Sequence, residues 1–340
     1  MIRTFIVLSS FAALTACGGG GDGATQAAVT QKSSEPQPSL KVVAVEPNPV
    51  LQRGAPGSFD SDDVLNPDVV KFNGQLFNFY SGWDGSVWRN GVATSSDGLT
   101  WTKGAPVLAP NTGGWSTQYI AANSGSVVFN GKILTYFHGQ TPNSIAIGLA
   151  ESADGSTFTQ HPTPVIEGVA GQFDAGAAAD PYVIQVGSQL FMYYLGDDGK
   201  GKQTIGLARS SDGVNWTRDG ASLMPLGGPG SFDERAHGEP AVTYAAPFYY
   251  MVFVGMDAQQ NRSLGWASSL DGVHWTKQST APLFTDAMKQ PWFSKLMCDP
   301  TILPTGKDDG TFYVWFGGGD VVAGSENLHG QIGRFTIKLN

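Results

Sequence analysis

Three carboxylates stand at equivalent points of three apolar segments in this 340-residue chain. Asp180, Glu239 and Asp299 are each followed by proline and an apolar stretch ("DPYVI", "EPAVT" and "DPTIL"), and they are 59 and 60 residues apart. A carboxylate that enters a buried segment is costly unless it is paired, and where one persists it is often functional. Carboxylates that meet at one site can carry out the proton transfers of sugar cleavage. The question is which architecture would bring them together.

The three carboxylates belong to a column of five repeated positions. "NPDVV" begins at Asn66 and "ANSGSVV" at Ala122, which extends the series backwards in steps of 58 and 56 residues. A regular period of this size is typical of propellers or arrays. A second motif has nearly the same period, and because Asp-Gly is a hairpin signal we expect its aspartates to form turns without a catalytic role. These are Asp97, Asp154, Asp212 and Asp271 in "SSDGLTWTK", "SADGSTFTQ", "SSDGVNWTR" and "SSLDGVHWTK".

Each column position opens the first strand of a unit of about four strands. A turn and a second apolar strand follow, as in "QLFNFYSG" and "QLFMYYLG", and then a third strand that contains a glycine. Five such units predict an all-β chain folded as a five-bladed β-propeller with four-stranded blades. The fifth unit lacks an outer strand, so we expect residues 42–51 to pair with Arg334–Leu339 and close the last blade without a free edge.

The composition agrees with this architecture, and the net charge limits which classes of molecule the protein is expected to bind. Charged residues make up only 14%, aromatic residues make up 11%, and 45 residues are glycine, which fits a β-rich chain with many tight turns. The net charge of −9 argues against nucleic acid and against an anionic membrane surface as partners. The charge is compatible with a neutral substrate, and we expect a monomer that acts on carbohydrate.

The first 40 residues are predicted to be a targeting signal and a linker. Residues 1–17 contain Arg3, a short apolar run and Leu14-Thr15-Ala16-Cys17, which resembles the bacterial lipobox. We expect Cys17 to become a lipidated N-terminus, and Gly18 after it indicates the outer membrane of a Gram-negative bacterium. Residues 18–40 read as a flexible linker and residues 41–340 as the propeller domain. The membrane would then be contacted through the N-terminal lipid only.

The innermost strands of a propeller face a central funnel, so the column residues should converge at one end of its axis. The turns between second and third strands share that rim, and they add aromatic and polar side chains suited to sugar rings. The residues predicted to bind substrate are Asn66, Trp83, Trp88, His138, Asp174, Asp197, Arg235, His237, Trp292 and Asp299. Alternatively, funnel carboxylates can hydrogen-bond backbone amides and only seal the ring.

The repeats and the column resemble the five-bladed furanosidase-type glycoside hydrolases, notably family 43 (arabinosidases and xylosidases), with family 32 related. The resemblance covers residues 41–340 and includes "NPV" at Asn48 and "NPD" at Asn66. It implies carboxylates on the innermost strands of blades one, three and four, which serve as general base, orienting residue and general acid. Asp180 would be the orienting residue that tunes the pKa, and Glu239 the acid, acting on furanose- or pentose-containing saccharides.

No cofactor is expected from the sequence. It contains neither an HExxH motif nor a Cys/His cluster with zinc spacing, and no phosphate loop or dinucleotide fingerprint. The resemblance allows a single metal in the funnel, held by histidine and water. Cys298 is expected to be a small core residue, and no intrachain disulfide can form if Cys17 is lipidated.

The position of the general base departs from the family pattern, because blade one has Asn66 and an amide cannot act as a base. Asp68, two residues on, would lie on the same face of a regular strand, one rung deeper. Three interpretations are open: Asp68 is the base, Asp299 or Asp60 replaces it, or the protein binds sugar without cleaving it. An inverting reaction needs about 6.5–9.5 Å between the two carboxyls, and a retaining reaction about 5–5.5 Å.

Overall fold

The computed structural model describes residues 36–111, 114–321 and 326–340. Residues 37–340 form one compact unit. The predicted signal peptide, Cys17 and most of the predicted linker lie outside the described residues. A search of the described residues finds no helix that is both long and apolar enough to cross a membrane.

The described part of the chain consists of strands and contains no α-helix, as the sequence predicts. Two short 3-10 turns, η1 (Asp286–Met288) and η2 (Pro291–Phe293), precede the last three strands. The strands are β1 (Leu40–Val45), β2 (Asp63–Leu65), β3 (Val69–Phe72), β4 (Gln75–Trp83), β5 (Trp88–Ser95), β6 (Thr102–Leu108), β7 (Tyr119–Phe129), β8 (Lys132–Gln140), β9 (Ile145–Ser152), β10 (Thr159–Gln160), β11 (Ala177–Val186), β12 (Gln189–Asp197), β13 (Gln203–Ser210), β14 (Thr217–Arg218), β15 (Ala236–Ala245), β16 (Phe248–Met256), β17 (Arg262–Ser269), β18 (Thr276–Lys277), β19 (Leu296–Pro304), β20 (Thr311–Gly319) and β21 (Gln331–Leu339).

Hydrogen bonding groups these strands into four sheets. Two have four strands each, in the orders β10-β9-β8-β7 and β1-β21-β20-β19, and a third contains β2 and β3, both paired with β4, followed by β5 and β6. In the largest sheet, one parallel bridge between Gln203 and Ala236 joins the antiparallel groups β11–β14 and β15–β18. The predicted count of five blades therefore depends on treating these two groups as separate units.

The N-terminal strand completes the last sheet. β1 lies antiparallel to β21 over Leu40–Val45, and Leu51 forms a further bridge with Ile332. Between these two points Arg334 forms an ion pair of 3.0 Å with Glu46. The predicted pairing of the two chain ends is confirmed, although the regular strand begins at Leu40 and its contacts beyond Val45 are isolated.

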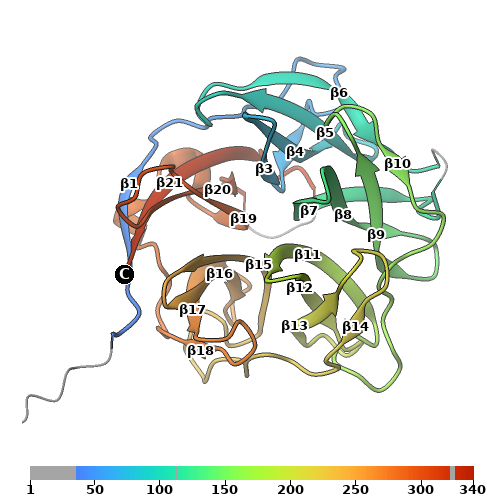
Figure 1. Ribbon diagram of the computed structural model, residues 1–340. Helices are drawn as coiled ribbons and strands as arrows, with labels where there is room; N and C mark the ends of the chain where they lie inside the picture. Colours follow the sequence, from blue (N-terminus) through green and yellow to red (C-terminus); the bar gives the residue numbers. More distant parts are fainter. Residues whose placement is uncertain (1–35, 112–113, 322–325) are drawn as a thin grey trace, which may run out of the picture. The chain divides into compact units, whose positions relative to one another are not determined.

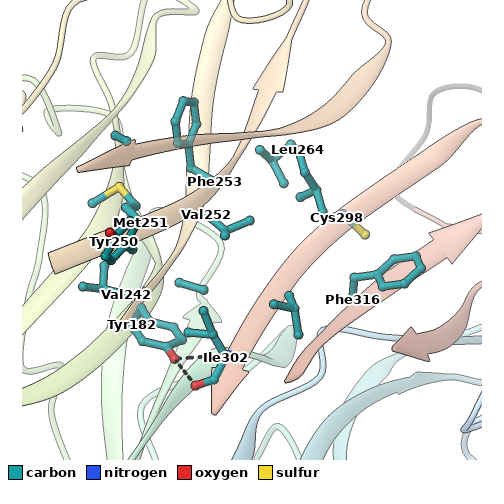
Figure 2. Packing of buried hydrophobic residues seen from close by; sticks show 14 of the residues in the cluster. Tyr182, Val242, Tyr250, Met251, Val252, Phe253, Leu264, Cys298, Ile302 and Phe316 are labelled. Carbon is teal, nitrogen blue, oxygen red and sulfur yellow. Dashed lines mark hydrogen bonds between the residues drawn. The ribbon is translucent and has the colours of Figure 1, made fainter. Parts of the chain in front are cut away.

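The innermost strands β3, β7, β11, β15 and β19 surround the centre of the unit (Figure 1). Contacts run from each of them to the next and from β19 back to β3. Between β11 and β19, the Tyr182 hydroxyl donates to the Ile302 carbonyl at 3.2 Å and accepts from the Ile302 N–H at 3.3 Å (Figure 2). The surrounding apolar side chains exclude water from these bonds, so the inner strands hold the residues at their ends in fixed positions.

The repeated Asp-Gly motifs form the expected turns. Asp97 Oδ1 accepts from the backbone N–H groups of Leu99 and Thr100 at 2.8 and 2.9 Å, and from the Ser95 hydroxyl at 3.0 Å. Gly98 has φ +70°, and a Cβ there would lie 2.5 Å from the Trp315 ring. The same carboxylate-to-backbone contacts recur at Asp154, Asp212 and Asp271. Their predicted role as turn-forming residues is confirmed.

Candidate functional site

Four of the five column residues share an uncommon backbone conformation. The φ angle is +53° at Asn66, +47° at Asp180, +49° at Glu239 and +47° at Asp299. Residues other than glycine rarely adopt this left-handed region, and backbone strain of this kind collects at functional sites. The equivalent positions of the repeat therefore share a strained backbone geometry as well as a place in the sequence.

A β-bulge accounts for this conformation and for the proline that follows. Asp180 and Pro181 together stand opposite one residue of β12, and Glu239 and Pro240 stand opposite one residue of β16. The register of β19 shifts in the same way at Asp299. A bulge leaves a residue unpaired, so a proline there sacrifices no ladder hydrogen bond. The bulge also breaks the regular alternation of side chains and redirects the carboxylate.

The redirected carboxylates line one cavity of about 490 Å³. It lies at the N-terminal ends of the inner strands, where Asp180, Glu239 and Asp299 come from β11, β15 and β19. Four more of the residues predicted to bind substrate line the same cavity: Asn66, Trp88, His138 and Asp197. The structure thus brings the three column carboxylates together with these four predicted substrate-binding residues.

Sequence reasoning missed several residues of this cavity, above all Arg262. A regular signal for it existed, because the third strands of four units contribute the residue three positions before their glycine. Those residues are Trp88, Ile145, Gln203 and Arg262, and they precede Gly91, Gly148, Gly206 and Gly265. Tyr119 and Glu326 also line the cavity without belonging to either repeated position.

Glu239 is held between a backbone donor and a cation. The Asp299 N–H donates to Glu239 Oε2 at 2.9 Å, and Arg262 Nη1 lies 3.8 Å from Glu239 Oε1. The Glu239 side chain is 13% exposed. Burial raises the pKa of Glu239 above its ordinary value; the Arg262 charge opposes this shift and the nearby Asp180 adds to it. A raised pKa is what a general acid needs near neutral pH.

Asp299 lies beside Glu239 in the buried wall of the cavity. Glu239 and Asp299 each have a carboxylate oxygen within 4.8 Å of the other and of the Cys298 sulfur. Burial, followed by the charges of Glu239 and Asp180, raises the pKa of Asp299 well above its usual value. Two carboxyl groups at this separation resist double ionisation, so the ionised form of either one disfavours ionisation of the other.

Asp180 has a histidine as its neighbour. His138 Nδ1 lies 3.0 Å from Asp180 Oδ1, and His138 Nε2 lies 3.1 Å from the Tyr119 hydroxyl. The tyrosine ring meets the imidazole edge-on at a centroid distance of 5.4 Å. This chain of contacts from β7 and β8 fixes the orientation of a carboxylate on β11.

The atoms of Glu239, Cys298 and Asp299 are close enough together to be considered as metal ligands. A metal-bound cysteine must be ionised. Burial raises the pKa of the Cys298 thiol well above its ordinary value, and the adjacent carboxylates raise it further. The donor set therefore fits a divalent cation poorly, and we assign none to it.

Asp68 lies elsewhere, contrary to the expected same-face position. The bulge at Asn66 separates β2 from β3, so the period of two does not carry across from Asn66 to Asp68. Asp68 lines a second cavity of about 550 Å³ toward the C-terminal ends of the inner strands. Its carboxylate accepts from the Ser126 N–H at 3.1 Å and from the Ser126 hydroxyl. Burial raises the pKa of Asp68 to about 7.

Asp174 forms a buried ion pair outside the carboxylate cavity. Its Oδ2 accepts from the Tyr194 hydroxyl at 2.9 Å and from Arg218 Nη1 at 2.7 Å, and its side chain is fully buried. Asp60, the other candidate base, contacts Tyr80 and Lys103 in the equivalent way. These contacts tie the segment before an inner strand to the outer strand of the same unit, which explains the repeated aromatic-Asp pairs.

The remaining predicted residues also lie outside the cavity lining. His237 is buried, its Nε2 contacts the Met224 carbonyl at 3.1 Å, and burial lowers its pKa to about 4. Trp83 packs against Trp88 at a centroid distance of 5.5 Å, and Trp292 donates to the Pro47 carbonyl at 3.1 Å. Arg235 is exposed to solvent.

Comparisons with known proteins agree with the architecture. The model of the glycosyl hydrolases family 32 N-terminal domain matches residues 68–227. A β-1,2-mannobiose phosphorylase from Listeria innocua has a similar structure, with a TM-score of 0.68 at 13% identity over 88% of this chain and 96% of that chain. A glycosyl hydrolase from Bacteroides ovatus gives a TM-score of 0.64 at 16% identity, covering 88% and 93%. The fold of this chain is that of the propeller-type glycoside hydrolases.

The predicted resemblance to this group of glycoside hydrolases is thereby confirmed. A curated relative, the uncharacterized protein Rv1502 of Mycobacterium tuberculosis, is 26% identical over 226 residues, which are 63% of this chain and 74% of that protein. The family 32 match includes Asp180 but ends before Glu239 and Asp299. The match therefore gives no information on Glu239 and Asp299, whose surroundings are described by the cavity alone.

Proposed function

We propose that the chain hydrolyses glycosidic bonds in the carboxylate cavity. The observation that supports this best is the convergence of Asp180, Glu239 and Asp299, each held in a strained bulge, on one cavity of about 490 Å³. A purely structural carboxylate needs no such geometry, whereas acid–base chemistry needs carboxyl groups in fixed positions. We assign Glu239 as the general acid and Asp180 as the orienting residue, with furanose- or pentose-containing saccharides as substrates.

The same proposal treats the fold as a five-bladed propeller. The single bridge at Gln203 makes the two groups of the largest sheet separable, and the inner strands then number one for each blade. Blades three, four and five would supply the three carboxylates. Blade one supplies Asn66, which lines the cavity but cannot take a proton from water.

Because Asp68 does not line the cavity, the second carboxylate of the reaction in this proposal is Asp299, or Asp180 if that residue also activates water in addition to orienting Glu239. The oxygens of Glu239 and Asp299 approach within 4.8 Å, which is shorter than the roughly 6.5–9.5 Å gap that leaves room for a water in an inverting pair. If Asp299 is the partner of Glu239, a retaining reaction fits better than an inverting one. If Asp180 is the partner, His138 Nδ1, 3.0 Å from Asp180 Oδ1, holds the carboxylate in the position that a base requires.

A rival function is glycan binding without cleavage, and Asn66 favours it. A screen on aryl glycosides of arabinofuranose, xylose, galactose and fructose, run beside a glycan array, separates the two. Mannobiose with and without inorganic phosphate is a further arm, because a similar structure carries the name mannobiose phosphorylase. Turnover that Glu239→Gln abolishes supports hydrolysis, whereas array binding without turnover on any substrate contradicts it.

We also propose that Cys17 anchors the domain to the outer membrane through a lipid. The lipobox-like sequence before Cys17 and the Gly/Ser-rich stretch after it support this location. A flexible tether would let the cavity reach saccharides near the membrane surface.

A further inference from the structure

Arg262 forms part of the wall between two cavities. It lines the carboxylate cavity and also a neighbouring cavity of about 450 Å³. Its side chain is 35% exposed, and its Nη1 is 3.8 Å from Glu239 Oε1. At that distance the guanidinium makes no direct hydrogen bond with this oxygen, so its donors can serve a ligand that enters from either cavity.

The neighbouring cavity has a surplus of available cations. Lys289 and Lys295 line it together with Arg262, and they come from three different segments of the chain. The Lys289 side chain is only 19% exposed, yet its ion pair is with Asp286, whose side chain is 97% exposed. An ion pair to so exposed a partner is weak and easily exchanged.

The other acid of this cavity is occupied within its own loop. Asp257 Oδ1 accepts from the N–H groups of Gln259 and Asn261 at 2.8 and 2.9 Å, and Asp257 Oδ2 accepts from Asn261 Nδ2 at 2.9 Å. These bonds form a turn and hold the Asp257 carboxylate within its own loop. The three cations that line the cavity outnumber its two carboxylates, Asp257 and Asp286, beside a site that is otherwise lined by carboxylates.

We propose that this second cavity is a subsite for an anionic group of the saccharide, a uronate carboxylate or a sulfate ester, bound by Arg262 and Lys289. This inference rests on the proposed function, because it places the neighbouring sugar of the same chain in the carboxylate cavity. Arg262 presents the planar pair of donors that matches a carboxylate or sulfate, and Lys289 adds a point charge. A neutral saccharide would leave both cations unused.

An anionic group at this subsite would also affect Glu239, the proposed general acid. The positive charge of Arg262 opposes the raised pKa of Glu239. A ligand anion that pairs with Arg262 would compensate this charge, so Glu239 would hold its proton more firmly when the correct saccharide is bound. Specificity and readiness for proton transfer would then depend on the same arginine.

Binding measurements test the subsite without requiring turnover. The full chain is titrated by calorimetry with matched pairs of disaccharides, galacturonate against galactose and glucuronate against glucose, and with a 6-sulfated galactose disaccharide as a separate arm. We expect at least one acidic member to bind about ten-fold or more tightly than its neutral parent, since a charge-assisted contact is stronger than a neutral one. The three arms distinguish a carboxylate ligand from a sulfate ligand.

Substitutions test whether a preference for acidic over neutral disaccharides depends on the second cavity. Lys289→Met and Arg262→Gln should each remove most of the acidic-over-neutral preference, while Lys132→Met should keep it, because Lys132 pairs with Glu151 at a different cavity. Equal affinity for acidic and neutral partners, or a preference that survives both substitutions, overturns the subsite. A retained preference in a protein that cleaves no glycoside would refute the proposed hydrolysis and leave the anionic subsite standing.

Discussion

Glu239 is the residue on which the proposed chemistry most depends. Glu239→Gln keeps the size of the side chain but cannot deliver a proton. General acid–base contributions are about 10²–10⁴-fold, so kcat/KM should fall by about that factor on a substrate with a poor leaving group. An aryl glycoside whose leaving group needs no protonation should lose much less. Steady-state kinetics on both substrates, with circular dichroism to confirm folding, make the measurement; full activity on the poor leaving group would rule out the assignment.

Asp68 leads to a prediction about stability. Burial raises its pKa from 3.8 to about 7, so between these pH values the unfolded chain releases a proton that the folded chain keeps. Wild-type stability should therefore fall as pH rises from about 4 to about 7, by up to about 4 kcal/mol from this group. Asp68→Asn lacks this dependence, so its melting temperature relative to wild type should increase with pH. Its kcat/KM should match wild type, and a loss of turnover would return Asp68 to the list of candidate bases.

At the scale of elements, the ion pair of Asp174 with Arg218 stabilises one unit without contacting the carboxylate cavity. Removing one partner of a buried pair leaves the other uncompensated, so Asp174→Asn should cost about 3–5 kcal/mol of unfolding free energy. The matched control is Asp219→Asn, which breaks the partly exposed pair with Arg209 and should cost less than about 1 kcal/mol. Denaturant unfolding measures both, and similar losses in the two variants would contradict the structural role of Asp174.

Strand β1 is the second element with a testable role. A chain that begins at residue 37 keeps all of β1, whereas one that begins at residue 53 loses five paired positions with β21 and the Glu46 contact. Cross-strand pairs contribute about 0.2–1 kcal/mol each, so the shorter chain should be less stable by about 1–5 kcal/mol. It should also expose an unpaired edge and aggregate more readily. Equal melting temperatures for the two chains would show that β1 is dispensable for closure.

What the sequence could predict follows from how the repeat is built. The period located Asp180, Glu239 and Asp299 because equivalent positions of repeated strands meet at one end of an axis. It failed for Asp68, since a bulge at the column residue changes the direction of its neighbours, and no rule of alternation contains that shift. It failed for Asp174 because that residue precedes β11 and its carboxylate contacts Tyr194 and Arg218 instead of the cavity. Arg262 could have been predicted from the sequence as a cavity residue, because its position relative to Gly265 repeats in four units. Its proximity to Glu239 depends on tertiary packing, which spacing alone does not give.

At the scale of the whole molecule, the two ends of the inner strands have different characters. One end has the carboxylate cavity, with its strained backbone and its adjacent cations. The other end has a cavity lined largely by aliphatic side chains with Asp68 buried in its wall. The proposed chemistry therefore belongs to a single end of the molecule, and the substrate must approach from that side.

The last prediction concerns how the whole molecule is held at the membrane. If Cys17 is lipidated, Cys17→Ser should leave an unprocessed or soluble form, because without the lipid the acidic domain has no attraction for an anionic surface. Gly18→Asp should retain the lipid but change the membrane in which the protein is found, according to the sorting pattern that Gly18 indicates. Membrane fractionation of the full-length chain, followed by immunoblotting, reports both changes. If the Cys17→Ser protein stays in the outer-membrane fraction, the anchor is not at Cys17. If both variants behave like wild type, residues 1–17 have a role other than the one their lipobox-like sequence suggests.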